Sequence, residues 1–216
     1  MVKERTAGKG FTLAEILITL TVIGVVAALT IPTLLQNTNQ AELIAAWKKT
    51  FGDIAQARLS ILAQDSTLDF DNSVSNSDDM KNDFAAKLNY IKSCNANIIA
   101  ECWHSANTVK TLLGNTASIM FQSDVRTSGL ILNNGIYLLI NRDNNTRGWV
   151  MADVNGAKPP NTLGKDIFIT RVTNSDIQPF GSDNEHETTY GDCSPPTAGT
   201  DIGLTGLACS AYYLDK

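Results

Sequence analysis

The stretch Lys9-Gly10-Phe11-Thr12-Leu13-Ala14-Glu15 opens an apolar run that carries no further charged side chain as far as Leu35. An ionised carboxylate such as that of Glu15 is costly inside a membrane unless it is paired. The run of roughly 25 residues from Phe11 to Leu35 is long enough to cross a bilayer as a helix. We therefore predict a transmembrane helix over residues 11–35, with one acid near its start.

Residues 1–10 form a short basic segment ahead of this run. Lys3, Arg5 and Lys9 against Glu4 give it a charge of +2, so a chain of net charge −5 carries −7 in the remainder. A basic flank is retained in the cytoplasm, which predicts a cytoplasmic leader and an extracytoplasmic body. The acidic body lacks the clustered Lys and Arg that phosphates require, so we expect no bulk nucleic-acid binding.

Two simpler interpretations of the N-terminus are a secretory signal peptide and a plain membrane anchor. A signal peptide has its small-residue cleavage site after the apolar core, whereas Gly8-Lys9-Gly10 precedes the core and no Ala-x-Ala-like site follows it. A plain anchor leaves both Glu15 and the Gly-Phe junction unexplained.

These N-terminal features closely resemble those of type IV prepilins and of type II secretion pseudopilins. The likeness is positional: Lys9-Gly10 ends a leader, Phe11 would be the new N-terminus, Glu15 follows four residues later, and Pro32 occupies the usual kink position. It is specific over residues 8–35 and only architectural for the head. The resemblance implies cleavage after Gly10, methylation of the Phe11 amine and a role for Glu15 in filament assembly.

The same resemblance implies partners and a location. A prepilin peptidase/N-methyltransferase would process the chain, and an inner-membrane assembly platform would build it into a homo-oligomeric filament with other pilins or pseudopilins. Before assembly it would be a single-pass inner-membrane protein with a periplasmic or extracellular head, and the filament would lie at the cell surface or in the periplasm. The alternative is a monomeric, membrane-anchored extracytoplasmic binding module, which predicts no cleavage at Gly10 and tolerance of Glu15 substitution.

Beyond Pro32 the apolar residues recur at spacings near three and four, which predicts that an amphipathic helix continues to residue 64. Its second half should pack against a head formed by residues 65–216. The predicted fold class is α+β: a long N-terminal helix, transmembrane in its first half, packed on a head with an antiparallel β-sheet. The predicted stripe consists of Leu35, Leu43, Ile44, Trp47, Phe51, Ile54, Ile61 and Leu62.

Within the head, the sequence predicts a polar loop over 65–77 and a short helix from Ser77 or Asp78 to about Ile91. Asn134-Gly135 is a strong hairpin signal because both residues readily take positive φ, and Asn155-Gly156 should close another strand. Residues 173–209 should be irregular, with a last edge strand over 211–214. The predicted strands cover residues 117–121, 129–132, 135–141, 149–154 and 166–172.

All four cysteines, Cys94, Cys102, Cys193 and Cys209, lie beyond the apolar run. Four cysteines allow three disulfide connectivities, of which sequence proximity favours Cys94–Cys102 with Cys193–Cys209. A zinc site made of all four thiolates usually needs Cys-x-x-Cys knuckles, and the sequence has none. In an oxidising compartment each bridge would add roughly 2–4 kcal/mol of stability.

The segment from Asp153 to Asp166 invites a calcium hypothesis, because oxygens of Asp153, Asn155 and Asp166 could converge on a hard cation. The EF-hand spacing and its closing glutamate are missing, however. The pattern resembles Asp-Val-Asn-Gly…Pro-Asn…Gly-x-Asp segments of large pilin-like proteins, where it looks like a structural turn. We expect a rigid Pro/Gly connection here, and no metal or other cofactor.

The sequence offers little for catalysis. His104 follows Cys102-Trp103, and His186 lies between Glu185 and Glu187. Neither has a second histidine one helical turn away, and no Gly-x-Ser-x-Gly elbow, Walker loop or dinucleotide fingerprint is present. The sequence therefore predicts a structural subunit and no enzymatic activity.

Overall fold

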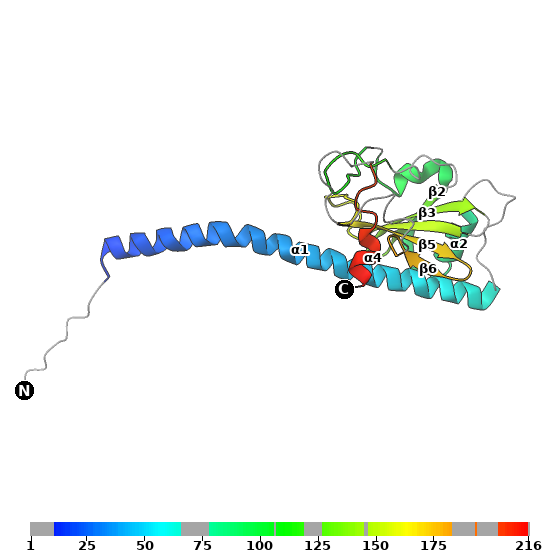
Figure 1. Ribbon diagram of the computed structural model, residues 1–216, viewed down its shortest axis with the longest axis horizontal. Helices are drawn as coiled ribbons and strands as arrows, with labels where there is room; N and C mark the ends of the chain where they lie inside the picture. The colour runs from blue at the N-terminus through cyan, green and yellow to red at the C-terminus, as the bar shows by residue number, and fades with distance from the viewer. Residues whose placement is uncertain are drawn as a thin grey trace, which may run out of the picture. The chain divides into compact units, whose positions relative to one another are not determined.

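The computed structural model describes residues 11–65, 78–105, 107–118, 127–144, 147–182, 193 and 203–215. The chain divides into two compact units, residues 1–41 and 42–216. Helix α1 (Leu13–Asp65) contains the boundary between them, so its last two dozen residues belong to the same unit as the sheet (Figure 1). The long helix predicted from the apolar pattern is therefore present, and its residues are divided between the two units.

In the first unit, the stretch Leu13–Pro32 of α1 is long and apolar enough to cross a membrane. Its 20 residues correspond to about 30 Å of helix, which matches the hydrocarbon thickness of a bilayer. Within the described part of the chain, none of this stretch is buried. Pro32 lies inside the helix and has no N–H, so the carbonyl of Ala28 loses its usual intrahelical donor.

The threonines of this stretch satisfy their hydroxyls locally. Thr19 Oγ1 donates to the carbonyl oxygen of Ile16 at 2.9 Å, and Thr21 Oγ1 donates to that of Leu17 at 2.7 Å. Thr30 Oγ1 makes the equivalent bond one turn back at 2.9 Å. These bonds leave no threonine hydroxyl to be satisfied by lipid, which is why the residues are tolerated in an apolar helix.

In the second unit, six strands form one antiparallel sheet in which spatial order equals sequence order. In such a meander each strand pairs with the next strand along the chain. The α+β fold class predicted from the sequence is confirmed. The strands are β1 (Tyr90–Cys94), β2 (Thr127–Leu132), β3 (Tyr137–Asn144), β4 (Arg147–Asp153), β5 (Ile167–Thr173) and β6 (Ile177–Pro179). The other helices within the described residues are α2 (Asp78–Ala85), the 3₁₀ helix η1 (Ala96–Glu101) and α4 (Cys209–Leu214).

The sheet is buried on both faces, and β4 shows this most clearly. Val150 and Ala152 belong to one apolar cluster, whereas Trp149 and Met151 belong to a second one. Because successive strand residues point to opposite faces, the two clusters lie on opposite sides of the sheet. The first cluster includes residues of α1, α2 and α4, and the second is completed by irregular segments such as the one containing Trp103.

Trp47 anchors α1 to the sheet. Its ring stacks on that of Phe168 in β5, with centroids 4.9 Å apart and planes 18° apart. The indole Nε1 donates a 2.9 Å hydrogen bond to the carbonyl oxygen of Ser210 in α4. Ile54 and Ile61 extend the contact along the same side of the helix, at the spacing expected of a buried stripe.

The two Asn-Gly turns lie against each other. Gly135 joins β2 to β3 with φ of +87°, and the predicted hairpin is confirmed by the pairing of these strands. Gly156 follows β4 with φ of +64°, and a Cβ atom there would lie 2.1 Å from the carbonyl oxygen of Gly135. Glycine is thus required at position 156 both for its backbone angle and for the close approach.

Several local predictions were wrong. The helix expected from residue 78 to about Ile91 ends at Ala85, and Tyr90–Cys94 form β1 instead. Ile91 lies in this strand and is 70% exposed. This segment pairs with β2, and that pairing outweighs its weak helical pattern. The sequence could not indicate the pairing, because the partner strand lies more than 30 residues away along the chain.

The C-terminal prediction was also wrong. The edge strand expected over 211–214 is helix α4, whose Ser210 Oγ accepts a hydrogen bond from the backbone N–H of Ile169 at 2.9 Å. Edge strand β6 lies in the region predicted to be irregular. In the strand expected over 117–121, Ala117 and Ser118 are irregular, and the remaining residues lie outside the described ones.

Candidate functional site

The N-terminal end of α1 is closed by a reciprocal pair of hydrogen bonds between Thr12 and Glu15. The backbone N–H of Glu15 donates to Thr12 Oγ1 at 3.2 Å, and the backbone N–H of Thr12 donates to Glu15 Oε2 at 2.8 Å. The Thr12 hydroxyl adds a 2.9 Å bond to the same carboxylate oxygen. This is a capping box, in which the cap residue and the third helical residue satisfy each other's backbone donors.

The capping box gives Glu15 a local partner in this chain. Its carboxylate lies in the first turn, where the helix dipole favours negative charge. Phe11 stands immediately before the cap with its side chain 85% exposed. Gly10 lies outside the described residues. Sequence reasoning singled out Glu15 but missed Thr12, although the pattern Thr-x-x-Glu before an apolar run is a recognised signature of a helix start.

The four cysteines form two disulfides, Cys94–Cys102 and Cys193–Cys209. These are the pairs that sequence proximity favours. The first bridge joins the end of β1 to the residue after η1, and the second joins residue 193 to the first residue of α4. Both bridges therefore connect irregular stretches to regular elements of the head.

A buried polar cluster lies at the end of β4. His104 Nε2 is 2.6 Å from Asp153 Oδ2, and the side chains of these two residues are only 7% and 0% exposed. The His104 ring also lies 5.2 Å from that of Trp103 and 5.7 Å from that of Tyr137. The pair is largely shielded from solvent and links the segment around Trp103 to the end of β4. The sequence did not predict this contact between His104 and Asp153.

Asp153 and Asp166, at the two ends of the connection between β4 and β5, each accept hydrogen bonds from the N–H groups of a backbone turn. Asp153 Oδ1 accepts the N–H groups of Asn155 and Gly156 at 3.0 and 2.8 Å. Asp166 accepts those of Asn161 and Thr162 at 2.8 and 2.6 Å. The segment therefore forms the rigid connection between β4 and β5 that its Pro and Gly content predicts.

The buried position of this cluster changes its acid–base behaviour. Burial raises the pKa of Asp153 to about 6, although the hydrogen bond to His104 acts in the opposite direction. The negative charge of Asp166 raises the pKa of Asp153 further. Burial also raises the pKa of Asp166, against its hydrogen bonds from the N–H groups of Thr162 and Asn161.

The calcium candidates Asp153, Asn155 and Asp166 lie within this one connection. Across the described ranges, no three or more His, Cys, Asp or Glu side chains come together in a way that could hold a metal ion. The Oδ1 atoms of Asn155 and Asn161 are buried and accept no hydrogen bond from the described part of the chain. The second histidine, His186, lies outside the described residues.

Comparison with known families decides the meaning of the N-terminal site. Residues 5–31 match the family model described as the prokaryotic N-terminal methylation motif. The chain carries the prepilin signature. This methylation motif is typical of type IV pilin-like and pseudopilin-like proteins, and it includes Gly10, Phe11 and the Thr12–Glu15 capping box. No curated protein and no solved structure matches the chain.

The methylation motif supports a type IV pilin-like or pseudopilin protein, a class of structural and not enzymatic proteins. It implies processing by a prepilin peptidase and assembly into filaments with other pilins. Together with the apolar stretch Leu13–Pro32, it indicates membrane anchoring. The motif ends at residue 31, one residue before Pro32.

Proposed function

We propose that this chain is a prepilin-like structural subunit of a type IV pilus or a type II secretion pseudopilus. Cleavage after Gly10 by a prepilin peptidase/N-methyltransferase would leave Phe11 as the N-terminus, and the subunit would polymerise through the first half of α1. The observation that carries the proposal is the position of Glu15, within a methylation motif and in the first turn of an apolar helix.

The exposed apolar surface of α1 supports a filament. The side chains of Leu13–Pro32 find no cover among the residues that the structure describes, so they would require lipid before assembly and other helices afterwards. A bundle of identical helices would supply that cover in the filament. The large exposed residues include Leu13, Leu17, Leu20, Ile23, Val26 and Leu29.

Cleavage would change the electrostatics beside Glu15. A new ammonium at Phe11 would stand one residue before the cap, within an apolar environment where a lone charge is costly. The Glu15 carboxylate can then pair with that ammonium on its own or an adjacent subunit. Methylation would keep the positive charge and add apolar surface to it.

The proposed partners follow from this pathway: other pilins or pseudopilins, the peptidase and an inner-membrane assembly platform. The subunit would begin as a single-pass inner-membrane protein with its head in the periplasm or outside the cell. The disulfides Cys94–Cys102 and Cys193–Cys209 support this location, because such bridges persist in oxidising compartments.

The decisive experiment is intact mass measurement and N-terminal sequencing of the full chain from cells with an active prepilin peptidase. We expect a chain that begins at methylated Phe11. A Gly10→Val variant should retain Met1, whereas the matched Gly8→Val variant should be processed normally. A wild-type chain that still begins at Met1 would overturn the proposal in favour of a monomeric anchored binding module.

A further inference from the structure

Lys81 of α2 carries an amine that is buried inside the head. Its side chain is only 2% exposed, and its helix neighbours Met80 and Phe84 belong to the apolar cluster that also contains Trp47. A lysine is almost never buried so completely unless its amine is paired. Among the described residues, Nζ of Lys81 contacts one amide and one carboxylate.

The amide is that of Asn95, which directly follows β1. Lys81 Nζ donates to Asn95 Oδ1. Asn95 occupies the N-cap position of η1, where an asparagine side chain commonly accepts a backbone N–H of the helix, yet it makes no such bond here. Oδ1 is one C=O bond, about 1.2 Å, from Cγ, so the amine lies beside the carbonyl carbon as well as the oxygen.

The carboxylate is that of Asp78, in the first turn of α2. Its Oδ1 lies 3.7 Å from Lys81 Nζ, and its side chain is 18% exposed. Residues three apart on a helix are neighbours, which explains why this acid reaches the amine. The separation exceeds the length of a normal hydrogen bond, so the ion pair compensates the buried charge only in part. The same acid is close enough to exchange a proton with Nζ.

We propose that Lys81 and Asn95 become joined by an intramolecular isopeptide bond, formed in the folded head with loss of ammonia. The Lys81 amine is the nucleophile, Asn95 Cγ is the atom attacked, and Asp78 carries the proton. Folding holds amine and amide in contact, which replaces an encounter in solution by a reaction within one molecule and raises its rate steeply.

The bonds and protons of this step balance. The Lys81 ammonium gives one proton to the Asp78 carboxylate, and the neutral Nζ attacks Asn95 Cγ. A second proton passes from Nζ to Nδ2 of Asn95, the bond between Cγ and Nδ2 breaks, and ammonia leaves. Ammonia takes up the proton held by Asp78 and departs as ammonium. The positive charge of the buried lysine therefore leaves with it, and the step needs no oxidant, reductant or further reactant.

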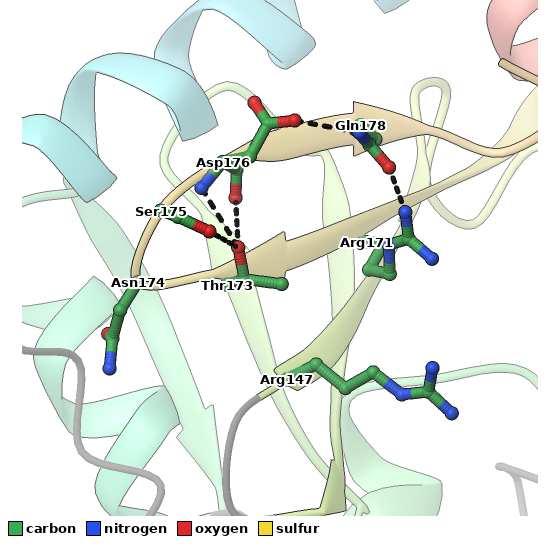
Figure 2. Close-up of a pocket in the computed structure, with 7 residues that line it drawn as sticks. All are labelled: Arg147, Arg171, Thr173, Asn174, Ser175, Asp176 and Gln178. Carbon is green, nitrogen blue, oxygen red and sulfur yellow. Dashed lines mark hydrogen bonds between the residues drawn. The ribbon is translucent and has the colours of Figure 1, made fainter. Parts of the chain in front are cut away.

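Two other contacts between a cation and an amide in the described residues lack this chemistry. Figure 2 shows Arg171 donating to Gln178 Oε1, with Gln178 bonded in turn to Asp176. A guanidinium keeps its proton in proteins, so it cannot attack the amide. Lys87 donates to Gln64 Oε1 at an exposed position, and no described acid forms an ion pair with it. The contact of α2 with Asn95 differs from both because it combines a buried amine, an amide and a nearby acid.

The proposed bond would lie next to a disulfide. Asn95 directly follows Cys94, whose bridge to Cys102 ties β1 to the end of η1. The isopeptide bond would add α2 to these linked elements, and a reducing agent would not break it. The proposal concerns the head alone, so its failure would leave the proposed filament role untouched.

The test is mass spectrometry of the folded full chain. We expect its intact mass to be about 17 Da, the mass of ammonia, below that of an unlinked chain with the same N-terminus. Trypsin cuts after lysine and arginine, so the bond should block the cut at Lys81. After reduction, the digest should contain one branched peptide that joins residues 59–87 to residues 93–110. The cut after Lys87 should proceed, because its contact with Gln64 should stay unlinked.

Two matched variants of α2 test the role of the acid. Asp78→Asn keeps the size of the side chain but cannot accept the proton, and general base catalysis is worth about 100-fold or more in rate. This variant should keep its full mass. Asp79→Asn makes the same change at a position that does not face Lys81, and it should lose ammonia like the wild type. If Asp78→Asn fails to fold, Asn95→Ser removes the amide at an exposed position and should also keep its full mass.

A folded wild-type chain that trypsin cuts normally after Lys81 would overturn the proposal and leave the contact as a hydrogen bond. Loss of ammonia located at Asn134 or Asn155, with Lys81 unlinked, would overturn it as well, because an asparagine before glycine can cyclise on its own. Equal formation of the branched peptide in Asp78→Asn and Asp79→Asn would overturn the role given to Asp78.

Discussion

His104 Nε2 lies 2.6 Å from Asp153 Oδ2, and this contact joins the segment after the Cys94–Cys102 disulfide to the last residue of β4. The two residues are 49 positions apart in the sequence. Asp153 also holds the turn at Asn155 and Gly156, so one carboxylate ties three parts of the head together. Its protonation should therefore influence the stability of the whole head.

We expect the stability of the protein to fall as pH rises through the titration of Asp153. Burial raises the pKa of this acid from 3.8 to about 6, so the folded state holds the proton more tightly than the unfolded state. The stabilising contribution is complete below pH 3.8 and is lost as pH rises through about 6. Its full size is about 3 kcal/mol.

Urea unfolding of the full chain in micelles, followed from about pH 4 to pH 7, would measure this loss. Asp153→Asn keeps an acceptor for the turn but cannot titrate, so its free energy of unfolding should vary less with pH. Asp215→Asn, at an exposed position, is the control and should behave like the wild type. An undiminished pH dependence in Asp153→Asn would contradict the assignment.

Variants of Thr12 and Glu15 separate helix capping from assembly. Glutamine can replace glutamate in a capping box, so Glu15→Gln keeps the cap and removes the charge. Thr12→Val keeps the charge and removes the hydroxyl, at a cost of about 1 kcal/mol in helix stability. If the charge drives assembly, filament yield should drop in Glu15→Gln and stay near wild type in Thr12→Val.

Filament yield can be measured by shearing and pelleting, with the membrane-bound pool quantified by immunoblot as the control. Both variants should insert and be cleaved normally, since neither alters Gly10 and neither adds a charge to the stretch Leu13–Pro32. A strong assembly defect in Thr12→Val with normal yield in Glu15→Gln would show that the capping box, and not the charge, is what assembly needs.

Trp47 should contribute strongly to the stability of the head. Trp47→Ala removes the stack on Phe168 and the bond to the Ser210 carbonyl, and it leaves a cavity under the sheet. We expect a loss of about 4 kcal/mol in the free energy of unfolding. Leu59→Ala on the same helix, where the side chain is 60% exposed, should change it by less than about 0.5 kcal/mol. Comparable losses in the two variants would mean that α1 is not docked through Trp47.

The Cys94–Cys102 disulfide should stabilise the head by restricting its unfolded chain. Its partners are 8 residues apart, and closing so short a loop is worth about 2.5 kcal/mol in the chain-entropy model. The double variant Cys94→Ala/Cys102→Ala should unfold at a correspondingly lower urea concentration. Reducing agent should then destabilise the wild type more than this variant, which retains only Cys193–Cys209. An equal effect on both would show that the first bridge adds nothing.

Millimolar calcium should leave the melting temperature of the full chain unchanged. The carboxylates of Asp153 and Asp166 already accept backbone N–H groups, and Asp153 is in addition paired with His104. Differential scanning fluorimetry with calcium, magnesium and chelator would measure the effect. A rise in melting temperature specific to calcium would contradict this expectation and would direct attention to the buried Oδ1 atoms of Asn155 and Asn161.

Features that depend on neighbouring residues could be predicted from the sequence. The apolar stretch, the acid at its start and the basic leader are local patterns, and the methylation motif lies entirely within them. The hairpin at Asn134-Gly135 is equally local, because the positive φ that Gly135 adopts there is one that glycine takes readily by itself. The Thr12–Glu15 capping box is also a local pattern, because its two residues are three positions apart. It could have been predicted from the sequence but was missed.

Features that depend on distant partners could not be predicted. The segment containing Ile91 becomes a strand only because β2 lies beside it, and residues 211–214 become helical where α4 meets Trp47. The pairing of His104 with Asp153 joins residues 49 positions apart, and no local pattern in the sequence indicates it. The sequence by itself therefore determined the long apolar helix and the methylation motif at its start, since these depend on short-range chemistry. Tertiary structure alone decided the burial of Asp153 and its contact with His104, because long-range packing sets both the burial of a side chain and its neighbours.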